Sequence, residues 1–203
     1  DKCQRKLFNS PGNFTAAKLA WIKVNMPHIY SKVYRLLLPG DYVAMKLTGT
    51  TTTTPSALSE GVLWDFEDDC LSDDVMGYFN FDPLIIPKIQ SVFSCHGKLT
   101  ARVAAELSLS DNVIISYKAG DQLNNTLALN CLKSGEFAAT CGTSGVICFI
   151  TESGGGTEGG KEGEEGIEKE ATNTFAYVTH THTNPRLLKL LCINGAGKMY
   201  SWV

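Results

Sequence analysis

The stretch Val113-Ile114-Ile115-Ser116-Tyr117-Lys118-Ala119-Gly120-Asp121 decides how this chain is interpreted. Its apolar, β-branched start predicts a short strand, which leads directly into the acid Asp121. In α/β sheets, ligands bind beyond the carboxyl ends of the strands, and Gly120 lets the backbone turn or lets a ligand approach closely. Asp121 is therefore a candidate for acid–base chemistry, although a single Asp after a strand is most often only a helix cap.

A second polar feature lies farther along the chain. Two β runs, Glu136–Thr140 and Val146–Ile150, are joined by Cys141-Gly142-Thr143-Ser144-Gly145, which predicts a β-hairpin. Backbone N–H groups in a glycine-flanked turn can converge on phosphate oxygens, although such a turn is usually no more than a turn. Together with Asp121, it would supply a proton acceptor and a phosphoryl cradle, which phosphoryl transfer requires together with Mg²⁺.

The remaining pattern predicts short helices and strands. Residues 15–38 predict two helices, because Pro27 ends the first and starts the second, and Pro39-Gly40 ends that second helix. The threonines Thr50–Thr54 predict an extended segment, since β-branched side chains are restricted in helices. Further helices are expected at Tyr42–Leu47 (capped by Asp41), from Ser72 onward, at Lys98–Leu107, at Thr126–Leu132 and within Gly195–Trp202, and further strands at Asn173–Thr179 and Leu187–Ile193.

The segment Glu152–Glu170 differs from the rest of the chain in composition. It contains seven Gly, seven Glu and two Lys, and Ile167 is its only aliphatic side chain. Such a segment buries too little apolar surface to offset the entropy lost on ordering. We therefore expect a disordered acidic insertion between two strands.

The overall composition narrows the class of protein. A chain of 203 residues, 43% hydrophobic, can bury one substantial core or two smaller ones. Its net charge of −3 argues against nucleic acid or a membrane surface as a partner. Seven cysteines without a Cys-x-x-Cys spacing indicate free thiols in a reducing cytoplasm rather than a metal site. Both chain ends are expected to be cuts in a longer sequence.

Several motifs, taken in order, resemble those of one enzyme family, the FGGY carbohydrate kinases, and are most like its xylulokinase members. The resemblance covers nearly the whole chain except Glu152–Glu170. It rests on Phe14–Ile22 with its Lys-x-x-Trp pattern, Leu37–Tyr42 followed by Leu47-Thr48-Gly49, Ser56–Gly61 with Trp64-Asp65, Ala119-Gly120-Asp121-Gln122, and Cys141–Val146.

The resemblance implies an α/β fold of the actin-like ATPase (ribonuclease-H-like) type. Residues 1–133 would form the C-terminal part of the first lobe, and residues 134–203 the start of the second. It implies ATP and Mg²⁺ as cofactors, and a possible homodimer of the full-length enzyme. Asp121 would be the catalytic base and Gln122 a sugar-binding residue. The residues implied to bind the ATP phosphates are Gly142, Thr143, Ser144 and Gly145.

The implied reaction is phosphorylation of a sugar, D-xylulose first among the candidates. Ribulose, gluconate, glycerol or a deoxy sugar are alternative substrates, because specificity depends on few contacts. A non-catalytic sugar-binding or pseudo-kinase role is an alternative to the enzymatic function. The family's Asp-x-Gly-Thr phosphate loop and its C-terminal glycine-rich adenosine motif are absent from the sequence. The isolated chain is therefore expected to be poorly soluble and inactive.

Overall fold

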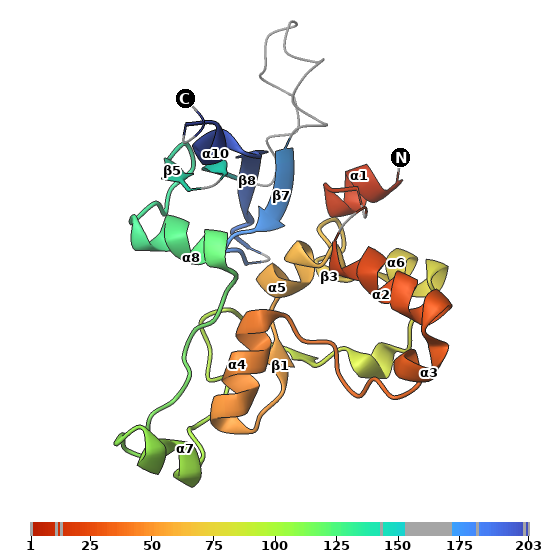
Figure 1. Ribbon diagram of the computed structural model, residues 1–203, viewed down its shortest axis with the longest axis vertical. Coiled ribbons are helices and arrows are strands. Elements are labelled where there is room, and N and C mark those ends of the chain that lie inside the picture. Colours follow the sequence, from red (N-terminus) through yellow and green to blue (C-terminus); the bar gives the residue numbers. More distant parts are fainter. Residues whose placement is uncertain are drawn as a thin grey trace, which may run out of the picture. The chain divides into compact units, whose positions relative to one another are not determined.

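The computed structural model describes residues 2–10, 12, 14–142, 144–152, 172–181, 183–200 and 202 (Figure 1). Thr143 and nearly all of the expected acidic insertion thus lie outside the described residues. The chain divides into two compact units, Asp1–Gly120 and Asp121–Val203. The expected lobe boundary at 133/134 stays a prediction, because compact units and family lobes need not coincide.

The first unit consists of short helices and two-stranded sheets. Strands β1 and β4 pair in parallel, and β2 and β3 pair antiparallel. Its elements are α1 (Lys2–Leu7), α2 (Thr15–Asn25), α3 (Pro27–Tyr30), α4 (Pro39–Thr48), β1 (Thr52–Thr53), α5 (Pro55–Glu60), β2 (Trp64–Asp65), β3 (Cys70–Leu71), α6 (Asp73–Tyr78), the 3-10 helix η1 (Pro83–Ile85), β4 (Lys88–Ile89) and α7 (Ala101–Glu106).

Side-chain caps explain where several of these helices begin. The hydroxyls of Thr54, Ser72 and Thr100 accept hydrogen bonds from backbone N–H groups in the first turns of α5, α6 and α7. Each bond satisfies a donor that the start of a helix otherwise leaves unpaired. The expected helix start at Ser72 is confirmed.

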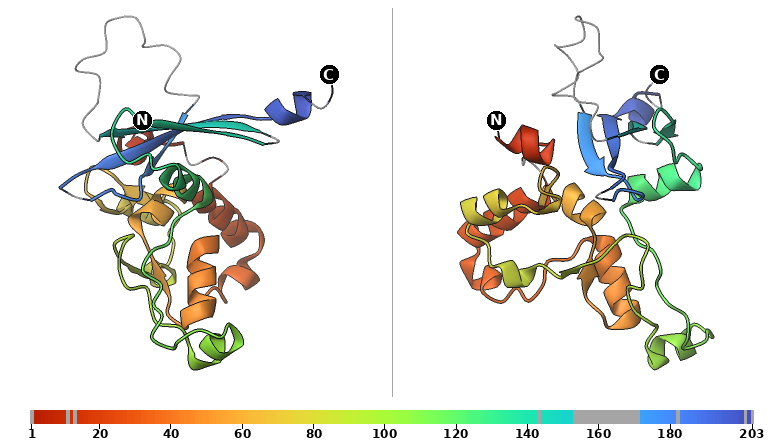
Figure 2. Two further views of the ribbon diagram at one scale, coloured as in Figure 1. Left: turned by 90° about the vertical axis from the view of Figure 1, so that its left-hand side faces the viewer. Right: turned by 180° about the vertical axis from the view of Figure 1, so that it is seen from behind.

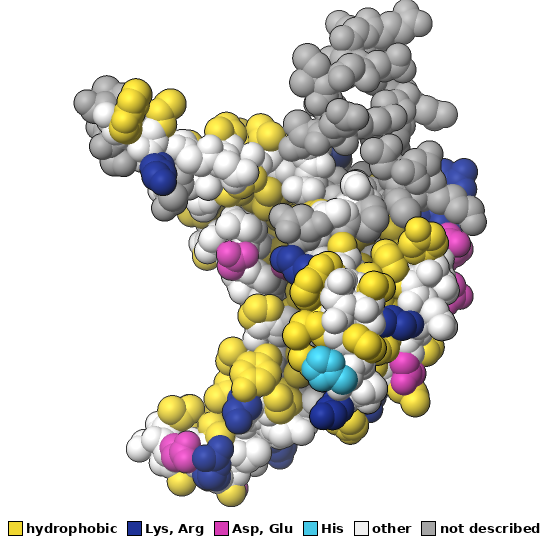
Figure 3. Space-filling view, turned by 45° about the vertical axis from the view of Figure 1, so that its right-hand side comes forward, with side chains coloured by type: hydrophobic (Ala, Val, Ile, Leu, Met, Phe, Trp, Pro, Cys, Tyr) yellow, Lys and Arg dark blue, Asp and Glu magenta, His cyan; other side chains and the backbone are white. Residues whose placement is uncertain are grey.

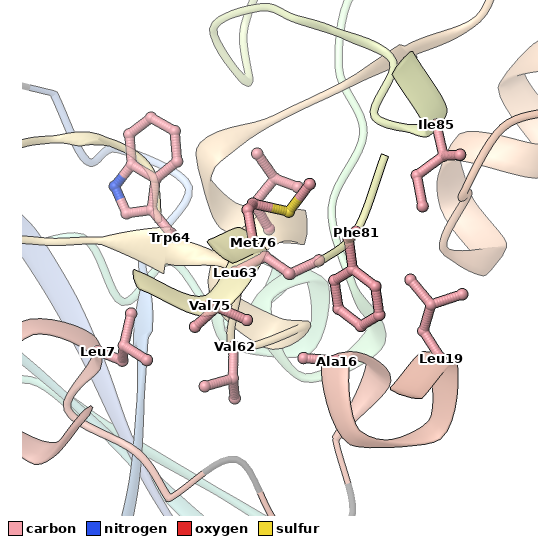
Figure 4. Packing of buried hydrophobic residues seen from close by; sticks show 11 residues of the cluster. Leu7, Ala16, Leu19, Val62, Leu63, Trp64, Val75, Met76, Phe81 and Ile85 are labelled. Carbon is pink, nitrogen blue, oxygen red and sulfur yellow. The ribbon is translucent and has the colours of Figure 1, made fainter. Parts of the chain in front are cut away.

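One apolar cluster forms the main core of the first unit. Figure 4 shows side chains from α1, α2, α6, η1 and the segment around β2 pointing toward one another. Burial of this kind contributes about 25 cal/mol per Å² of apolar surface, so the cluster can stabilise a unit whose helices are individually too short to persist alone. Its buried members are Leu7, Ala16, Leu19, Leu58, Val62, Leu63, Trp64, Val75, Met76, Phe81 and Ile85.

The second unit is built on a four-stranded antiparallel sheet in the order β5-β6-β8-β7. Buried Cys148, Ile150, Leu188 and Leu190 alternate along the central strands β6 and β8, as expected for one covered sheet face. The elements of this unit are α8 (Asp121–Ala128), β5 (Phe137–Cys141), β6 (Gly145–Glu152), β7 (Thr172–Ala176), β8 (Arg186–Ile193) and α10 (Ala196–Tyr200).

Four expectations for local structure are wrong. Asp41 does not cap the helix expected at Tyr42–Leu47, because α4 begins at Pro39 after Leu38 and Asp41 lies in its first turn. Val113–Ile115 forms no strand: Ile114 makes an isolated bridge to Lys98, and Tyr117 makes one to Phe93. Pro39 begins α4 instead of ending the preceding helix, because proline fits the first turn, where its missing N–H costs nothing. The helix expected from Thr126 begins at Asp121.

No helix among the described residues is both long and apolar enough to cross a bilayer. On the face drawn in Figure 3, Lys and Arg side chains are interspersed with Asp and Glu.

Candidate active site

Asp121 is the first residue of α8, and its side chain is exposed. Its Oδ1 accepts a hydrogen bond of 2.8 Å from the backbone N–H of Gln122. A carboxylate in this position is favoured because the helix start carries a partial positive charge. The side chain is thus held at the helix start while remaining accessible, which is compatible with the acid–base role expected for it.

Gln122 and Thr126 lie one turn apart on α8 and are joined by a hydrogen bond. The Thr126 hydroxyl donates to the Gln122 carbonyl over 2.9 Å, and the Leu123 side chain is buried. The side-chain oxygen Oε1 of Gln122 is buried and has no hydrogen-bond partner among the described residues. A buried amide oxygen ordinarily needs a donor, so this oxygen keeps an unused acceptor position within the described residues.

The thiol of Cys148 connects α8 to the sheet. Burial raises its pKa; a hydrogen bond with Thr126 opposes that shift, and the negative charge of Asp121 adds to it. Residues of α8 therefore lie close to the middle of β6, in agreement with Figure 2 (left), which draws α8 beside the hairpin. Cys148 stays a neutral thiol near neutral pH, which favours a packing role over a nucleophilic one.

The predicted hairpin is confirmed, with Cys141 opposite Gly145 in the antiparallel register of β5 and β6. The N–H of Gly142 donates to the Ser144 carbonyl over 3.1 Å, so this N–H is already occupied inside the turn. A Cβ at Gly145 would lie 3.4 Å from the Ala196 side chain. The turn is therefore closed by its own backbone. Among the described residues of the turn, Ser144 has a side-chain hydroxyl that could contact a ligand.

The sheet does not bring Asp121 and the turn into direct contact by any hydrogen bond among the described residues. Cys148, near which Asp121 lies, is three residues along β6 from Gly145, or roughly 10 Å at the usual rise per residue. The two predicted halves of the site therefore belong to one unit, but Asp121 begins α8, which lies beside the middle of β6, whereas the turn lies at the start of β6.

Sequence reasoning missed a buried polar cluster just before Asp121. Lys118 Nζ lies 2.7 Å from Asp41 Oδ1 and also donates to the carbonyl and the hydroxyl of Thr52. The Thr52 hydroxyl lies 3.1 Å from His96 Nδ1, and His96 Nε2 lies 3.0 Å from the Val92 carbonyl. The available signal was Lys118 itself, a cation in an otherwise apolar run that must find a partner when buried.

His96 of this cluster and Tyr117, the residue before Lys118, have shifted pKa values. Burial lowers the pKa of His96; the Val92 carbonyl opposes this, and the Lys118 charge adds to it. Burial, with a smaller contribution from Glu60, raises the pKa of Tyr117 to about 12. The lowered pKa of His96 and the raised pKa of Tyr117 both favour the neutral forms of these side chains at pH 7.

The described residues contain no group of three His, Cys, Asp or Glu side chains able to hold a metal ion. Mg²⁺ in phosphoryl-transfer sites is commonly bound by one or two carboxylates together with substrate phosphates and waters. The exposed carboxylate of Asp121 is compatible with one such contact.

Comparison with known proteins supplies the family. Residues 4–128 match the N-terminal domain of the FGGY family of carbohydrate kinases. The chain is 29% identical over 140 residues to a xylulose kinase of Staphylococcus xylosus. The matched region covers 69% of this chain and 29% of that protein. The chain therefore spans less than a third of the length of this relative.

Solved structures of kinases share the fold. A structure titled as a xyloylose kinase from Brucella ovis superposes with a TM-score of 0.81 at 24% identity, covering 98% of this chain and 39% of that one. A glycerol kinase of Plasmodium falciparum, solved with ADP, superposes at 0.76 with 21% identity, covering 98% and 38%. The mixed α/β structure is thus that of these kinases over part of their length, and the chain belongs to the FGGY family of carbohydrate kinases.

Proposed function

We propose that this chain is a segment of an ATP-dependent sugar kinase of the actin-like ATPase fold, in which Asp121 is the catalytic base. The observation that carries the proposal is the placement of Asp121: an accessible carboxylate at the start of α8, directly after Ala119-Gly120, in a chain of the FGGY family. The lobe assignment, residues 1–133 and 134–203, belongs to the same proposal.

In the proposed reaction, Asp121 accepts the proton of a sugar hydroxyl while that oxygen forms a bond to the γ-phosphorus of ATP. The bond from this phosphorus to the β-bridging oxygen breaks, and ADP leaves. Gln122 Oε1, buried and unpaired among the described residues, accepts a hydrogen bond from a second sugar hydroxyl. General-base catalysis of this kind contributes about 10²–10⁴-fold in rate.

The hairpin turn is proposed to contact the ATP phosphates through Ser144 and the backbone of Gly142 and Gly145, with Thr143 outside the described residues. Because the Gly142 N–H already bonds within the turn, the hydroxyl and N–H of Ser144 are the main described donors. Mg²⁺, when bound, would neutralise charge on the β- and γ-phosphates.

D-xylulose is the proposed sugar, because the curated relative with 29% identity is named a xylulose kinase. We propose a reducing, cytoplasmic location for the enzyme, since its proposed substrates, the sugar and ATP, are found there. The described thiols Cys70, Cys95, Cys131, Cys141, Cys148 and Cys192 are free, as expected for that compartment.

The test is a substrate panel on the intact protein that contains this chain. ADP release is followed with D-xylulose, ribulose, gluconate, glycerol and no sugar. The proposal expects the highest kcat/KM with D-xylulose and little ADP release without sugar. A clear preference for another sugar would refute the substrate assignment, and absence of sugar-dependent ADP release would favour the non-catalytic alternative.

A further inference from the structure

The three residues before Asp121 are each fixed within the first unit. Lys118 and Asp41 form a buried ion pair, with side chains only 6% and 2% exposed. A Cβ at Gly40 would lie 3.3 Å from the Ala119 carbonyl, so α4 begins in close contact with that peptide group. A Cβ at Gly120 would collide with the Glu60 carboxylate, so Gly120 packs closely against the end of α5.

The hydrogen bonds of Lys118 use its full capacity. An ammonium group has three N–H donors, and three acceptors surround this one: Asp41 Oδ1, the Thr52 carbonyl and the Thr52 hydroxyl. Because these acceptors come from α4 and β1, the side chain joins two separate elements to the segment before Asp121. The Thr52 hydroxyl can then donate to His96, which extends the cluster.

A buried ion pair of this kind adds little net stability, since desolvation offsets most of the attraction, but breaking one partner is costly. Its other effect is geometric: a fully bonded ammonium has few alternative positions. Three extended residues span at most roughly 10 Å, so fixing Lys118 restricts where the backbone reaches Asp121.

We propose that Lys118, held by Asp41 and Thr52, is a positioning residue that fixes the backbone leading into the catalytic base Asp121. This inference rests on the proposed function. Displacing a reacting group by about 1 Å can cost around 10²-fold in rate. Loss of the clamp is therefore expected to lower kcat by about 10–100-fold.

The experiment uses the intact kinase and three single variants. Lys118→Met keeps the length of the stem but removes the charge; Lys98→Met is the matched control, because Lys98 is an exposed lysine of the same unit. Asp121→Asn tests the base itself. For each protein, kcat and KM are measured by ADP release, sugar Kd by calorimetry and folding by circular dichroism.

A double variant, Lys118→Met with Asp121→Asn, separates positioning from general damage. If Lys118 acts through the base, Lys118→Met lowers kcat in the wild-type background but leaves the residual turnover of Asp121→Asn unchanged. Near-normal kcat in folded Lys118→Met, or an equal further loss in the Asp121→Asn background, would overturn the positioning role.

Two further results make the outcome unambiguous. If Lys118→Met does not fold, the double variant Lys118→Met with Asp41→Leu also removes the Asp41 carboxylate that the first change leaves buried without its partner. This double variant is then tested in the wild-type and Asp121→Asn backgrounds in the same way. If Asp121→Asn keeps normal turnover, the proposed function fails. If Asp121→Asn is impaired but Lys118→Met keeps normal turnover, only the positioning role of Lys118 fails.

Discussion

The two sides of the Gly120–Asp121 peptide bond are held by different interactions. On the first side, Lys118 is buried and saturated with acceptors from two elements. On the second, the Asp121 side chain is exposed, and the turn at Gly142 is closed by one described backbone hydrogen bond. The fold thus holds the segment that leads into the proposed base tightly, whereas the Asp121 side chain itself is accessible.

The largest stability effect is expected from Gly97→Ala, next to His96 in the polar cluster. Gly97 has a φ of +132°, and a Cβ there would lie 2.7 Å from the Thr48 Cβ. Backbone strain and overpacking together should cost about 3–5 kcal/mol, measured by chemical denaturation of the intact protein.

Gly135→Ala in the second unit is the matched control. Its φ of +88° is also positive, but no atom lies within 4 Å of the added Cβ, so only backbone strain of about 1–2 kcal/mol is expected. Equal losses for the two variants would show that the packing around Gly97 is looser than described.

Core truncation should separate the two units. Leu58 and Leu188 are both fully buried, one in each unit, and Leu→Ala at either should cost about 3 kcal/mol. Hydrogen exchange read by mass spectrometry should show faster exchange in first-unit peptides for Leu58→Ala and in second-unit peptides for Leu188→Ala. Uniformly faster exchange in both variants would argue against two separate cores.

The polar cluster should give the first unit a pH dependence. Since burial lowers the pKa of His96 below 6.5, the unfolded state binds more protons between the two pKa values. This contribution to stability is complete above about pH 6.5 and is lost as the pH falls toward the folded pKa. His96→Gln should flatten the dependence of the melting temperature between pH 7.5 and 5.5.

The exposed His28 provides the control for that measurement. His28→Gln should leave the slope of melting temperature against pH unchanged. The same slope in wild type and His96→Gln would mean that His96 is not the group responsible.

Much of the local structure was predictable because short-range chemistry determines it. The cap at Ser72, the extended threonines at β1 and the hairpin before Gly145 follow from single side chains or turns. The strand expected at Val113–Ile115 is replaced by isolated bridges, from Ile114 to Lys98 and from Tyr117 to Phe93. Apolar β-branched residues cannot reveal that from sequence.

The candidate site was predictable only as separate parts. Asp121 and the Gly142–Gly145 turn are visible in sequence as motifs, but nothing in their spacing shows that α8 lies beside the middle of β6 while the turn lies at its start. The Lys118–Asp41 pair joins residues 77 positions apart, a separation over which local patterns carry no information. Only the fold brings these two residues together.

The smallest stability effect is expected at the turn. Ser144→Ala removes a hydroxyl that makes no hydrogen bond with the described residues, so stability should change by less than about 0.5 kcal/mol. If the hydroxyl contacts ATP, KM for ATP should rise about 2–10-fold, the value of one hydrogen bond. An unchanged KM for ATP would remove Ser144 from the proposed phosphate site.

Asp121→Asn in the intact protein tests the central claim most directly. The amide keeps the shape of the side chain but cannot accept the hydroxyl proton as a carboxylate does. Single-turnover rates with saturating sugar and ATP should fall by about 10²–10⁴-fold, while calorimetry gives a sugar Kd within about threefold of wild type. A single-turnover rate near that of wild type would show that Asp121 is not the catalytic base.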